Sequence, residues 1–445
     1  MQKSIENPSV FRDLWKSMLG LGLVTLTLGV VVLVWPGKSV VVAGALFGNW
    51  LGIMGYIEAG WFWFGNQGLS YIQLGRFWQI AFFIGLITWS VLVFRALWPT
   101  SVMLWRATRQ FWSGRIRLEN LIWAATINIA VLYVFGMIPL TGIGKSFTIT
   151  DFWRWWVVHL WVEGFFEVFA TVVIAFLLTR LKLLSVPTAT RAVLFSTVVF
   201  LSGGIIGTFH HLYFAGTPNI VLGLGAVFSA LEVVPLVLIG FEAWENIRLA
   251  RSREQHVWVA AYKWPIYFFV AVAFWNFVGA GLFGFLINPP IALYYMQGLN
   301  TTPVHGHTAL FGVYGMLGLG LMLFCLRALR PGKAWKNAPL SFAFWAINIG
   351  LALMVLLSML PIGLMQTWAS VEYGTWYARS AEFLHSGHMN NLRWMRMIGD
   401  TIFALGAIVL GWFVLGLVTG HSYAEQGYVP EGGWEVRPEA PVLGR

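Results

Sequence analysis

Long apolar stretches recur along nearly the whole chain and constrain its fold more than any other feature. A helix needs about 20 apolar residues to cross a bilayer, and ten such stretches occur in the 445 residues. Only 10% of the residues are charged, whereas soluble domains carry about 25%. The sequence therefore predicts an all-α integral membrane protein, a polytopic bundle of about ten transmembrane helices. The predicted spans lie near 15–35, 77–98, 119–140, 153–179, 189–212, 219–243, 263–287, 304–327, 338–362 and 398–419.

The remaining segments fit one membrane domain. We expect residues 1–445 to form a single unit, with residues 420–445 as a cytoplasmic tail. The stretch near 40–56 is apolar but glycine-rich, which predicts a re-entrant or interfacial segment. Cys325 is the only cysteine, which excludes a disulfide within the chain and a thiolate metal centre.

Basic residues cluster in alternate predicted loops, and this pattern predicts the topology. Because positive residues favour the cytoplasmic side, all four basic loops and both termini are expected in the cytoplasm. The net charge of +10 then reflects membrane orientation rather than a nucleic-acid partner. The expected location is the cell inner membrane. The basic residues are Lys3, Arg12 and Lys16 at the start, then Arg106, Arg109, Arg115 and Arg117, then Arg180, Lys182 and Arg191, then Arg248, Arg251, Arg253 and Lys263, and finally Arg327, Arg330, Lys333 and Lys336.

Five histidines and a glutamate lie inside the predicted spans. They occur as His159-Leu-Trp-Val-Glu163, His210-His211 and His305-Gly-His307. Ionisable side chains are costly in hydrocarbon and usually functional there, and imidazole is the commonest metal ligand. The predicted topology places all five histidines toward the outer, periplasmic side at similar depth. The pattern therefore predicts one metal assembly.

The spacing of these residues suggests how they share metals. His159 and Glu163 lie four residues apart, so they share one face of a helix. His210 and His211 diverge by about 100° on a regular helix, yet both can reach one ion near a helix end. Three imidazoles and a carboxylate favour non-haem iron. His305 and His307 project to nearly opposite sides, so their helix could hold a haem on each flank.

These motifs, in this order, resemble the catalytic subunit of the haem–copper oxidase superfamily, and within it the nitric oxide reductases of the quinol-dependent type. The similarity extends over nearly the whole chain. It includes Gly48-Asn-Trp-Leu-Gly52, Gly75-Arg-Phe-Trp-Gln, Trp376-Tyr-Ala-Arg-Ser and the run from Arg396 through Gly399-Asp400-Thr-Ile-Phe.

The resemblance implies cofactors and their ligands. Non-haem iron would be bound by His159, His210, His211 and Glu163. A high-spin haem b3 would have His305 as its proximal ligand, and a low-spin haem b would have His307 as one axial ligand. The implied activity is the reduction of two NO molecules to N2O and water. Oxygen-reducing relatives of the main type carry a tyrosine where this chain has Glu163, so the carboxylate points to NO rather than oxygen as the substrate.

Two further carboxylates and two arginines are candidate site residues. The resemblance gives Glu167 and Glu232 a role in proton delivery or in tuning the iron, and the alternative is hydrogen bonding for packing. Arg393 and Arg396, near the start of the last predicted span, could pair with haem propionates or extend to the membrane interface. A solvated surface is expected for the other four histidines, which are His256, His385, His388 and His421.

Two departures from the family pattern concern electron delivery. No histidine precedes His159, so the second ligand of the low-spin haem has no counterpart upstream. Matching the spans to the twelve-helix family core leaves its first two helices missing, or supplied by a second polypeptide. Asn66 and Ser70 replace a histidine and a glutamate of the quinol site, which argues against quinol and favours a cytochrome donor. Asp400 would survive from that site.

The sequence therefore predicts a membrane nitric oxide reductase and leaves two kinds of alternative open. One is NO dismutation or oxygen reduction on the same scaffold. The other is a non-catalytic subunit that binds or senses NO.

Overall fold

A computed structural model describes residues 76–101, 117–137, 146–180, 184–235, 261–329 and 332–429. The predicted span near 15–35, the glycine-rich stretch near 40–56, Asn66, Ser70 and His256 lie outside these ranges. Everything below concerns the described residues.

Long apolar helices dominate the part of the chain that the structure describes, which confirms the predicted fold class. Eight of them are long and apolar enough to cross a membrane. The expected span at 219–243 is described only as a shorter apolar segment, Asn219–Pro235. The eight helices are Gln79–Leu97, Leu118–Met137, Asp151–Arg180, Val186–Ala215, Lys263–Ile287, Thr301–Leu329, Asn337–Tyr373 and Gly387–Thr419.

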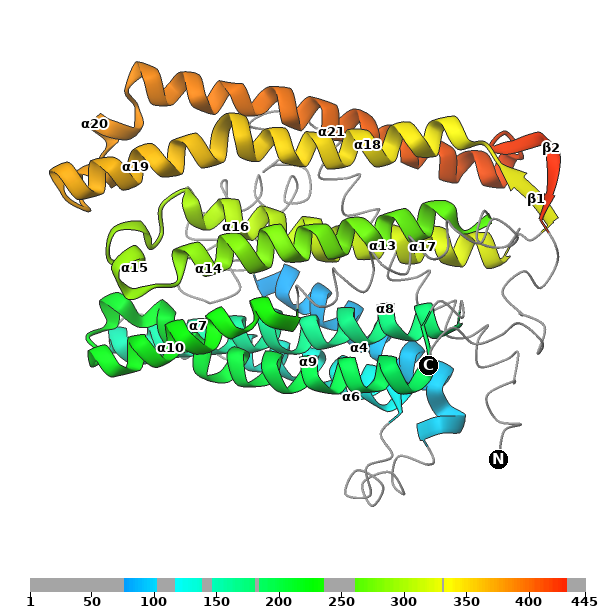
Figure 1. The fold of residues 1–445 in the computed structure, drawn as a ribbon, viewed down its shortest axis with the longest axis horizontal. Coiled ribbons are helices and arrows are strands. Elements are labelled where there is room, and N and C mark those ends of the chain that lie inside the picture. Colours follow the sequence, from blue (N-terminus) through cyan, green and yellow to red (C-terminus); the bar gives the residue numbers. More distant parts are fainter. Residues whose placement is uncertain are drawn as a thin grey trace.

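These helices lie side by side along the long axis of the molecule (Figure 1). The elements follow in the order α4 (Arg76–Ser101), α6 (Leu118–Met137), α7 (Phe147–His159), η3 (Leu160–Phe166), α8 (Glu167–Arg180), α9 (Val186–Ile206), η4 (Gly207–Ala215), α10 (Asn219–Leu231), α13 (Lys263–Trp275), η5 (Asn276–Phe283), α14 (Gly284–Ile287), α15 (Pro290–Met296), α16 (Thr301–Ala309), η6 (Leu310–Gly315), α17 (Met316–Leu329), β1 (Gly332–Trp335), α18 (Asn337–Met354), η7 (Val355–Met359), α19 (Leu360–Tyr373), η8 (Tyr377–Arg379), α20 (Ala381–Leu384), α21 (Gly387–Thr419) and β2 (Tyr423–Val429).

Three tiers of helices are visible in Figure 1. α18, α19 and α21 form one edge, α13 to α17 form the middle, and α6 to α10 form the opposite edge. Small residues allow the closest contacts within a tier: a Cβ atom on Gly399 of α21 would lie 2.5 Å from the backbone nitrogen of Met354 on α18. Close backbone approach at small residues is typical of helix packing in membranes.

Four of the long helices contain a π-helical segment that the hydrophobic pattern did not predict. These segments are η3, η5, η6 and η7. In addition, η4 is a 3-10 helix with a kink at Leu212. The expectation that Glu163 and the His210–His211 pair lie on regular α-helices was therefore wrong. Irregular helical turns of this kind often mark functional sites.

The last helix begins earlier than the sequence predicts. The expected start was near residue 398, but α21 begins at Gly387. The side chain of Ser386 accepts a hydrogen bond from the backbone nitrogen of Met389 and caps the helix there. Arg393 and Arg396 therefore lie within the helix rather than beside its first turn.

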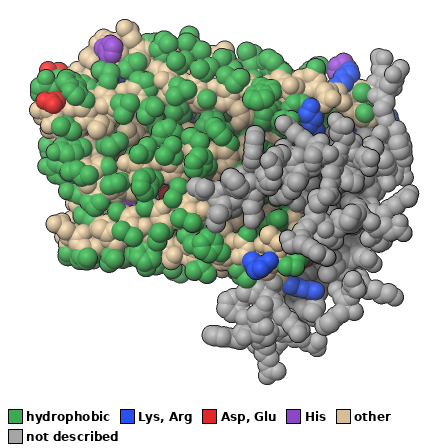
Figure 2. All heavy atoms as spheres, in the orientation of Figure 1, with side chains coloured by type: hydrophobic (Ala, Val, Ile, Leu, Met, Phe, Trp, Pro, Cys, Tyr) green, Lys and Arg blue, Asp and Glu red, His purple; other side chains and the backbone are tan. Residues whose placement is uncertain are grey.

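The outer surface is apolar along the tiers. Figure 2 shows hydrophobic side chains over most of the described face, with Lys and Arg mostly toward the end that carries β1 and β2. That end also holds the antiparallel pairing of β1 with β2, so the predicted tail begins with a strand. Ends of α8, α13 and α17 lie toward the same end (Figure 1), as the alternation of basic loops predicts. Which end faces the cytoplasm stays a prediction.

Candidate metal centre

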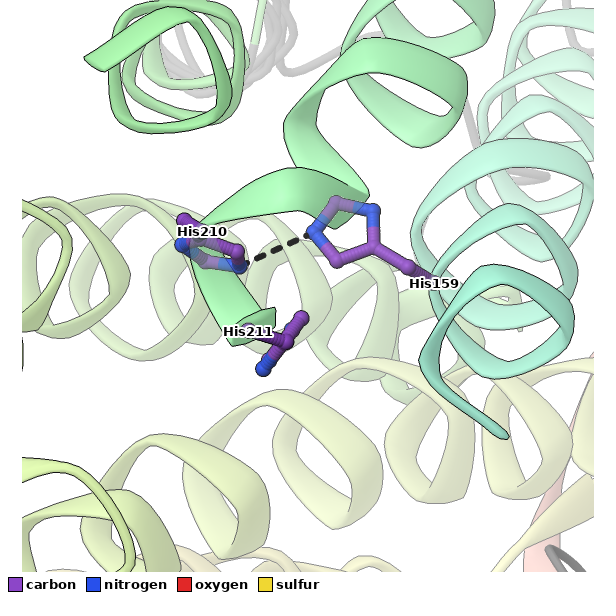
Figure 3. A group of neighbouring side chains, drawn as sticks. All are labelled: His159, His210 and His211. Carbon is purple, nitrogen blue, oxygen red and sulfur yellow. Dashed lines mark hydrogen bonds between the residues drawn. The ribbon is translucent and has the colours of Figure 1, made fainter. Parts of the chain in front are cut away.

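Three histidines from two separate segments converge inside the bundle (Figure 3). His159 ends α7, and His210 and His211 lie in η4. One ring nitrogen of each lies within 4.8 Å of the others, and the Nε2 atoms of His159 and His210 are 3.2 Å apart. Two nitrogens that bind one ion at about 2.1 Å are separated by roughly 3 Å. The three imidazoles therefore fit ligands of a single metal ion.

Close backbone packing places these rings. A Cβ atom on Gly225 of α10 would overlap the backbone around Phe209 and His210. A Cβ atom on Gly207 would lie 3.1 Å from Cε1 of His159. Glycine at these two positions lets α10 and η4 approach, which sets the rings against each other.

Glu163 completes the cluster from η3. Its Oε2 atom lies 2.7 Å from Nε2 of His159, and its Oε1 atom lies 3.9 Å from Nε2 of His305. The carboxylate therefore stands between the three-histidine cluster and the histidine of α16. The π-helical turn keeps Glu163 beside His159, so the predicted neighbourhood of the two residues is present even though the predicted regular helix is not.

Glu232 also reaches the cluster. One of its oxygens lies within 4.8 Å of ligand atoms of His159 and Glu163. Its Oε1 atom is buried and has no hydrogen-bond partner among the described residues. A Cβ atom on Gly203 would overlap the carboxylate, so this glycine makes room for it. The sequence placed Glu232 in an apolar span without indicating that it approaches the histidines so closely.

Glu167 lies one turn farther along, at the start of α8. The hydroxyl of Tyr314 on η6 is 3.1 Å from Oε1 of Glu167 and 3.0 Å from the carbonyl oxygen of Val162, so it can donate to either. The other oxygen of Glu167 is buried and has no hydrogen-bond partner in the described ranges. Sequence reasoning missed Tyr314, because a tyrosine in an apolar helix is an ordinary packing residue until its neighbour is known.

The two histidines of α16 face different parts of the molecule. Nδ1 of His305 lies 2.9 Å from the carbonyl oxygen of Gly279, and its Nε2 faces Glu163. Nδ1 of His307 lies 2.9 Å from the carbonyl oxygen of Pro303. Its Nε2 is 3.3 Å from Nη2 of Arg396 on α21. An Nδ1–H donated to a carbonyl leaves the Nε2 lone pair for a metal, so both rings fit axial ligands of a haem.

The predicted propionate arginines already have partners within the chain. Arg393 donates to the carbonyl oxygen of Leu384, and Nε of Arg396 donates to Oδ1 of Asp400 at 3.2 Å. Arg396 is thus close to His307, whereas Arg393 is tied to the segment before α21. Three of the histidines expected at the surface, His385, His388 and His421, are exposed.

A polar link that the sequence did not predict ties the outer segment to the cluster. Nη1 of Arg379 donates to the carbonyl oxygen of Thr375 at 2.9 Å, and Nη2 donates to the carbonyl oxygen of Gln297. The side chain of Gln297 in turn donates to the carbonyl oxygen of His211 at 2.8 Å. Arg379 belongs to the Trp376-Tyr-Ala-Arg-Ser motif, which offered the only hint of a role.

Comparison with known proteins agrees with this arrangement. Residues 14–402 match the family model described as "Cytochrome C and Quinol oxidase polypeptide I". A curated relative, a nitric oxide reductase subunit of Stutzerimonas stutzeri, is 27% identical over 296 residues, which is 65% of this chain and 60% of that relative. The chain therefore aligns with less than two thirds of the relative's length.

The fold is also similar to that of a solved structure. A heme-copper terminal oxidase dimer, determined by cryo-electron microscopy, superposes with a TM-score of 0.54 at 13% identity, covering 96% of this chain and 86% of that chain. At this identity the likeness concerns the fold. Together with the family match over most of the sequence, it shows that the chain belongs to the cytochrome c and quinol oxidase polypeptide I family, the subunit I family of the haem–copper oxidases.

Proposed function

We propose that the chain is the catalytic subunit of a membrane-bound nitric oxide reductase. In this reaction two NO molecules, two protons and two electrons give one N2O and one water. The observation that carries the proposal is Glu163, a carboxylate 2.7 Å from a histidine of the three-histidine cluster. A carboxylate can ligate iron and accept protons, but it cannot act as the redox donor that oxygen cleavage requires of a tyrosine. The relative from Stutzerimonas stutzeri, which is named as part of a nitric oxide reductase, supports the same choice.

The donor set suits non-haem iron beside a high-spin haem b3. His159, His210, His211 and Glu163 would hold the iron, because imidazole and carboxylate suit iron. His305 would hold haem b3, and His307 would hold a low-spin haem b. When bound, these groups supply the two electrons and neighbouring metal positions for the two NO molecules. The chain itself orients the ligands and excludes water by burying His159 and His210.

Buried carboxylates would manage the two protons. Glu232 and Glu167 each have a buried oxygen without a partner among the described residues. Such an oxygen can carry a proton and pass it to a neighbouring group. The hydroxyl of Tyr314 would orient Glu167 toward the cluster.

Electrons would come from a protein partner. The relative is named as one subunit of a complex, which supports a cytochrome or a second polypeptide as the donor rather than quinol. The proposed location is the inner membrane, with the metal centre toward the periplasmic side.

An NO electrode tests the proposal on the purified chain, with ascorbate and a mediator as reductant and with N2O detected in parallel. Rapid NO loss matched by N2O would support the reductase. Release of O2 from labelled NO would instead indicate dismutation, and rapid O2 consumption would indicate an oxygen reductase. NO binding without turnover in haem-replete protein would indicate a sensing subunit and contradict the proposal.

A further inference from the structure

Asn288 lies beside the three-histidine cluster, although it is absent from every motif discussed above. It sits between α14 and α15 and is 3% exposed. An asparagine side chain has two N–H donors and an oxygen acceptor. Burial makes each unmet hydrogen bond costly. The partners of Asn288 therefore indicate its role.

Ser229 on α10 orients the amide. Nδ2 of Asn288 donates to Oγ of Ser229 at 2.8 Å. The nitrogen and oxygen of an amide point in different directions, so this bond turns Oδ1 away from Ser229. Oδ1 is buried and makes no other formed hydrogen bond within the described ranges. It lies in reach of the His210 side chain, with which Asn288 interacts.

His210 presents the complementary group. Its Nε2 atom faces Nε2 of His159 at 3.2 Å, so Nδ1 lies on the side of the ring away from that nitrogen. Nδ1 is also buried and lacks a formed hydrogen bond among the residues described. A donor without a partner and an acceptor without a partner thus lie next to each other, and a small rotation of the amide would close the bond.

We propose that Asn288, held by Ser229, is a positioning residue that accepts the Nδ1–H of His210 and so presents Nε2 to the metal. A neutral imidazole carries a single N–H, and a bond to that N–H fixes which nitrogen keeps its lone pair. This inference rests on the metal centre of the proposed function. It adds a residue that neither touches the metal nor carries charge.

The other histidines of the cluster are held by different means. The ring of His211 stacks on Trp155 with centroids 4.3 Å apart and planes 7° apart. His159 has Glu163 beside its Nε2 atom. Only His210 relies on Asn288, so loss of this amide should disturb one ligand and leave the rest of the cluster in place. Outer partners of metal-bound histidines commonly contribute 10- to 100-fold in metal affinity.

The test compares iron binding by the full-length native chain with that of four variants in detergent. Asn288→Leu removes the acceptor at similar volume, and Asn288→Asp keeps an oxygen acceptor. Ser229→Ala removes only the anchor of the amide. Asn348→Leu is the matched control, because it deletes a buried amide that bonds Trp275 at 2.8 Å on α18.

Iron stoichiometry, the rate of ferrous iron release to a chelator and the Mössbauer signature of the bound iron are measured together with the thermal midpoint. We expect Asn288→Leu to lose iron roughly 10- to 100-fold faster than the native chain, Ser229→Ala to show a smaller effect, and Asn288→Asp to retain iron. Asn348→Leu should lower the thermal midpoint while leaving iron release unchanged.

Native-like iron release in Asn288→Leu would overturn the inference, and so would equal losses in the Asp and Leu variants. If Asn288→Leu does not fold, unchanged iron release and an unchanged Mössbauer signature in Ser229→Ala would overturn it. A native chain that takes up no iron would contradict the metal centre itself, and this inference with it. The two failures are therefore distinguishable.

Discussion

Single residues carry the chemistry, and here the sequence was most informative where the residue type is rare in a membrane. Five histidines and Glu163 stood out because ionisable groups in hydrocarbon are costly, and the structure brings four of these histidines into one neighbourhood with Glu163. Tyr314, Asn288 and Gln297 could not be found in this way. Each is an ordinary residue whose role depends on a partner far away in the sequence.

At this scale we expect His211→Ala to abolish NO turnover by at least about 100-fold, because removal of one ligand weakens the iron site. Haem content should stay close to that of the native chain, since neither haem histidine is altered. NO consumption per haem is the measurement. His388→Ala is the control, because His388 is exposed on α21. Unchanged turnover of His211→Ala at full haem content would contradict the proposed centre.

A second substitution tests the carboxylate chain. Tyr314→Phe removes the hydroxyl near Oε1 of Glu167 while keeping the ring. We expect kcat to fall roughly 10-fold, with iron and haem content unchanged, because proton-transfer groups contribute about 10²- to 10⁴-fold and only the orientation of one is lost. The solvent isotope effect on kcat should rise. A native kcat in this variant would show that Glu167 needs no such partner.

Whole elements were predicted in their existence but not in their internal geometry. The spans follow from hydropathy, which reads apolar length and does not distinguish α-, π- and 3-10 turns. For this reason η3 and η4, the two segments that carry Glu163 and the His210–His211 pair, were expected as regular helix. The early start of α21 was missed because its first turns are polar, and only the Ser386 cap marks the boundary.

The contact between α10 and η4 makes an element-scale prediction. Gly225→Ala places a methyl group against the backbone of His210, and overpacking of this kind costs about 1–3 kcal/mol. We expect a lower thermal midpoint together with lower iron content. Gly223→Ala is the matched control two residues away, since a Cβ atom there meets nothing within 4 Å. Equal behaviour of the two variants would mean that this contact does not position the histidines.

At the scale of the whole molecule, the alternation of basic loops predicts opposite sides for the two ends of the bundle. Cys325 is the only cysteine of the chain and is buried, so the native protein should resist a membrane-impermeant thiol reagent. His385 precedes α21 and His421 follows it, and both are exposed. They offer one labelling position near each end of that helix.

In spheroplasts we expect His385→Cys to react with an impermeant maleimide without permeabilisation. We expect His421→Cys to react only after the membrane is opened, because that end is predicted to be cytoplasmic. Labelling is measured by the mass shift of the purified chain. The reverse pattern would invert the topology and place the metal centre toward the cytoplasm.

The π-helical turn after His159 also bears on how chains of this kind can change in length. A π turn holds one residue more than the α turn that could replace it, so a single deletion within 160–166 could be absorbed by conversion of the segment to α-helix. Every later residue of that helix would then keep its place in the sequence order but turn by about 100° and shift by about 1.5 Å relative to His159. Glu167 would leave Tyr314, while the hydrophobicity of the span would hardly alter. An alignment could record such a change as one harmless gap, although it would separate the histidine from its second carboxylate.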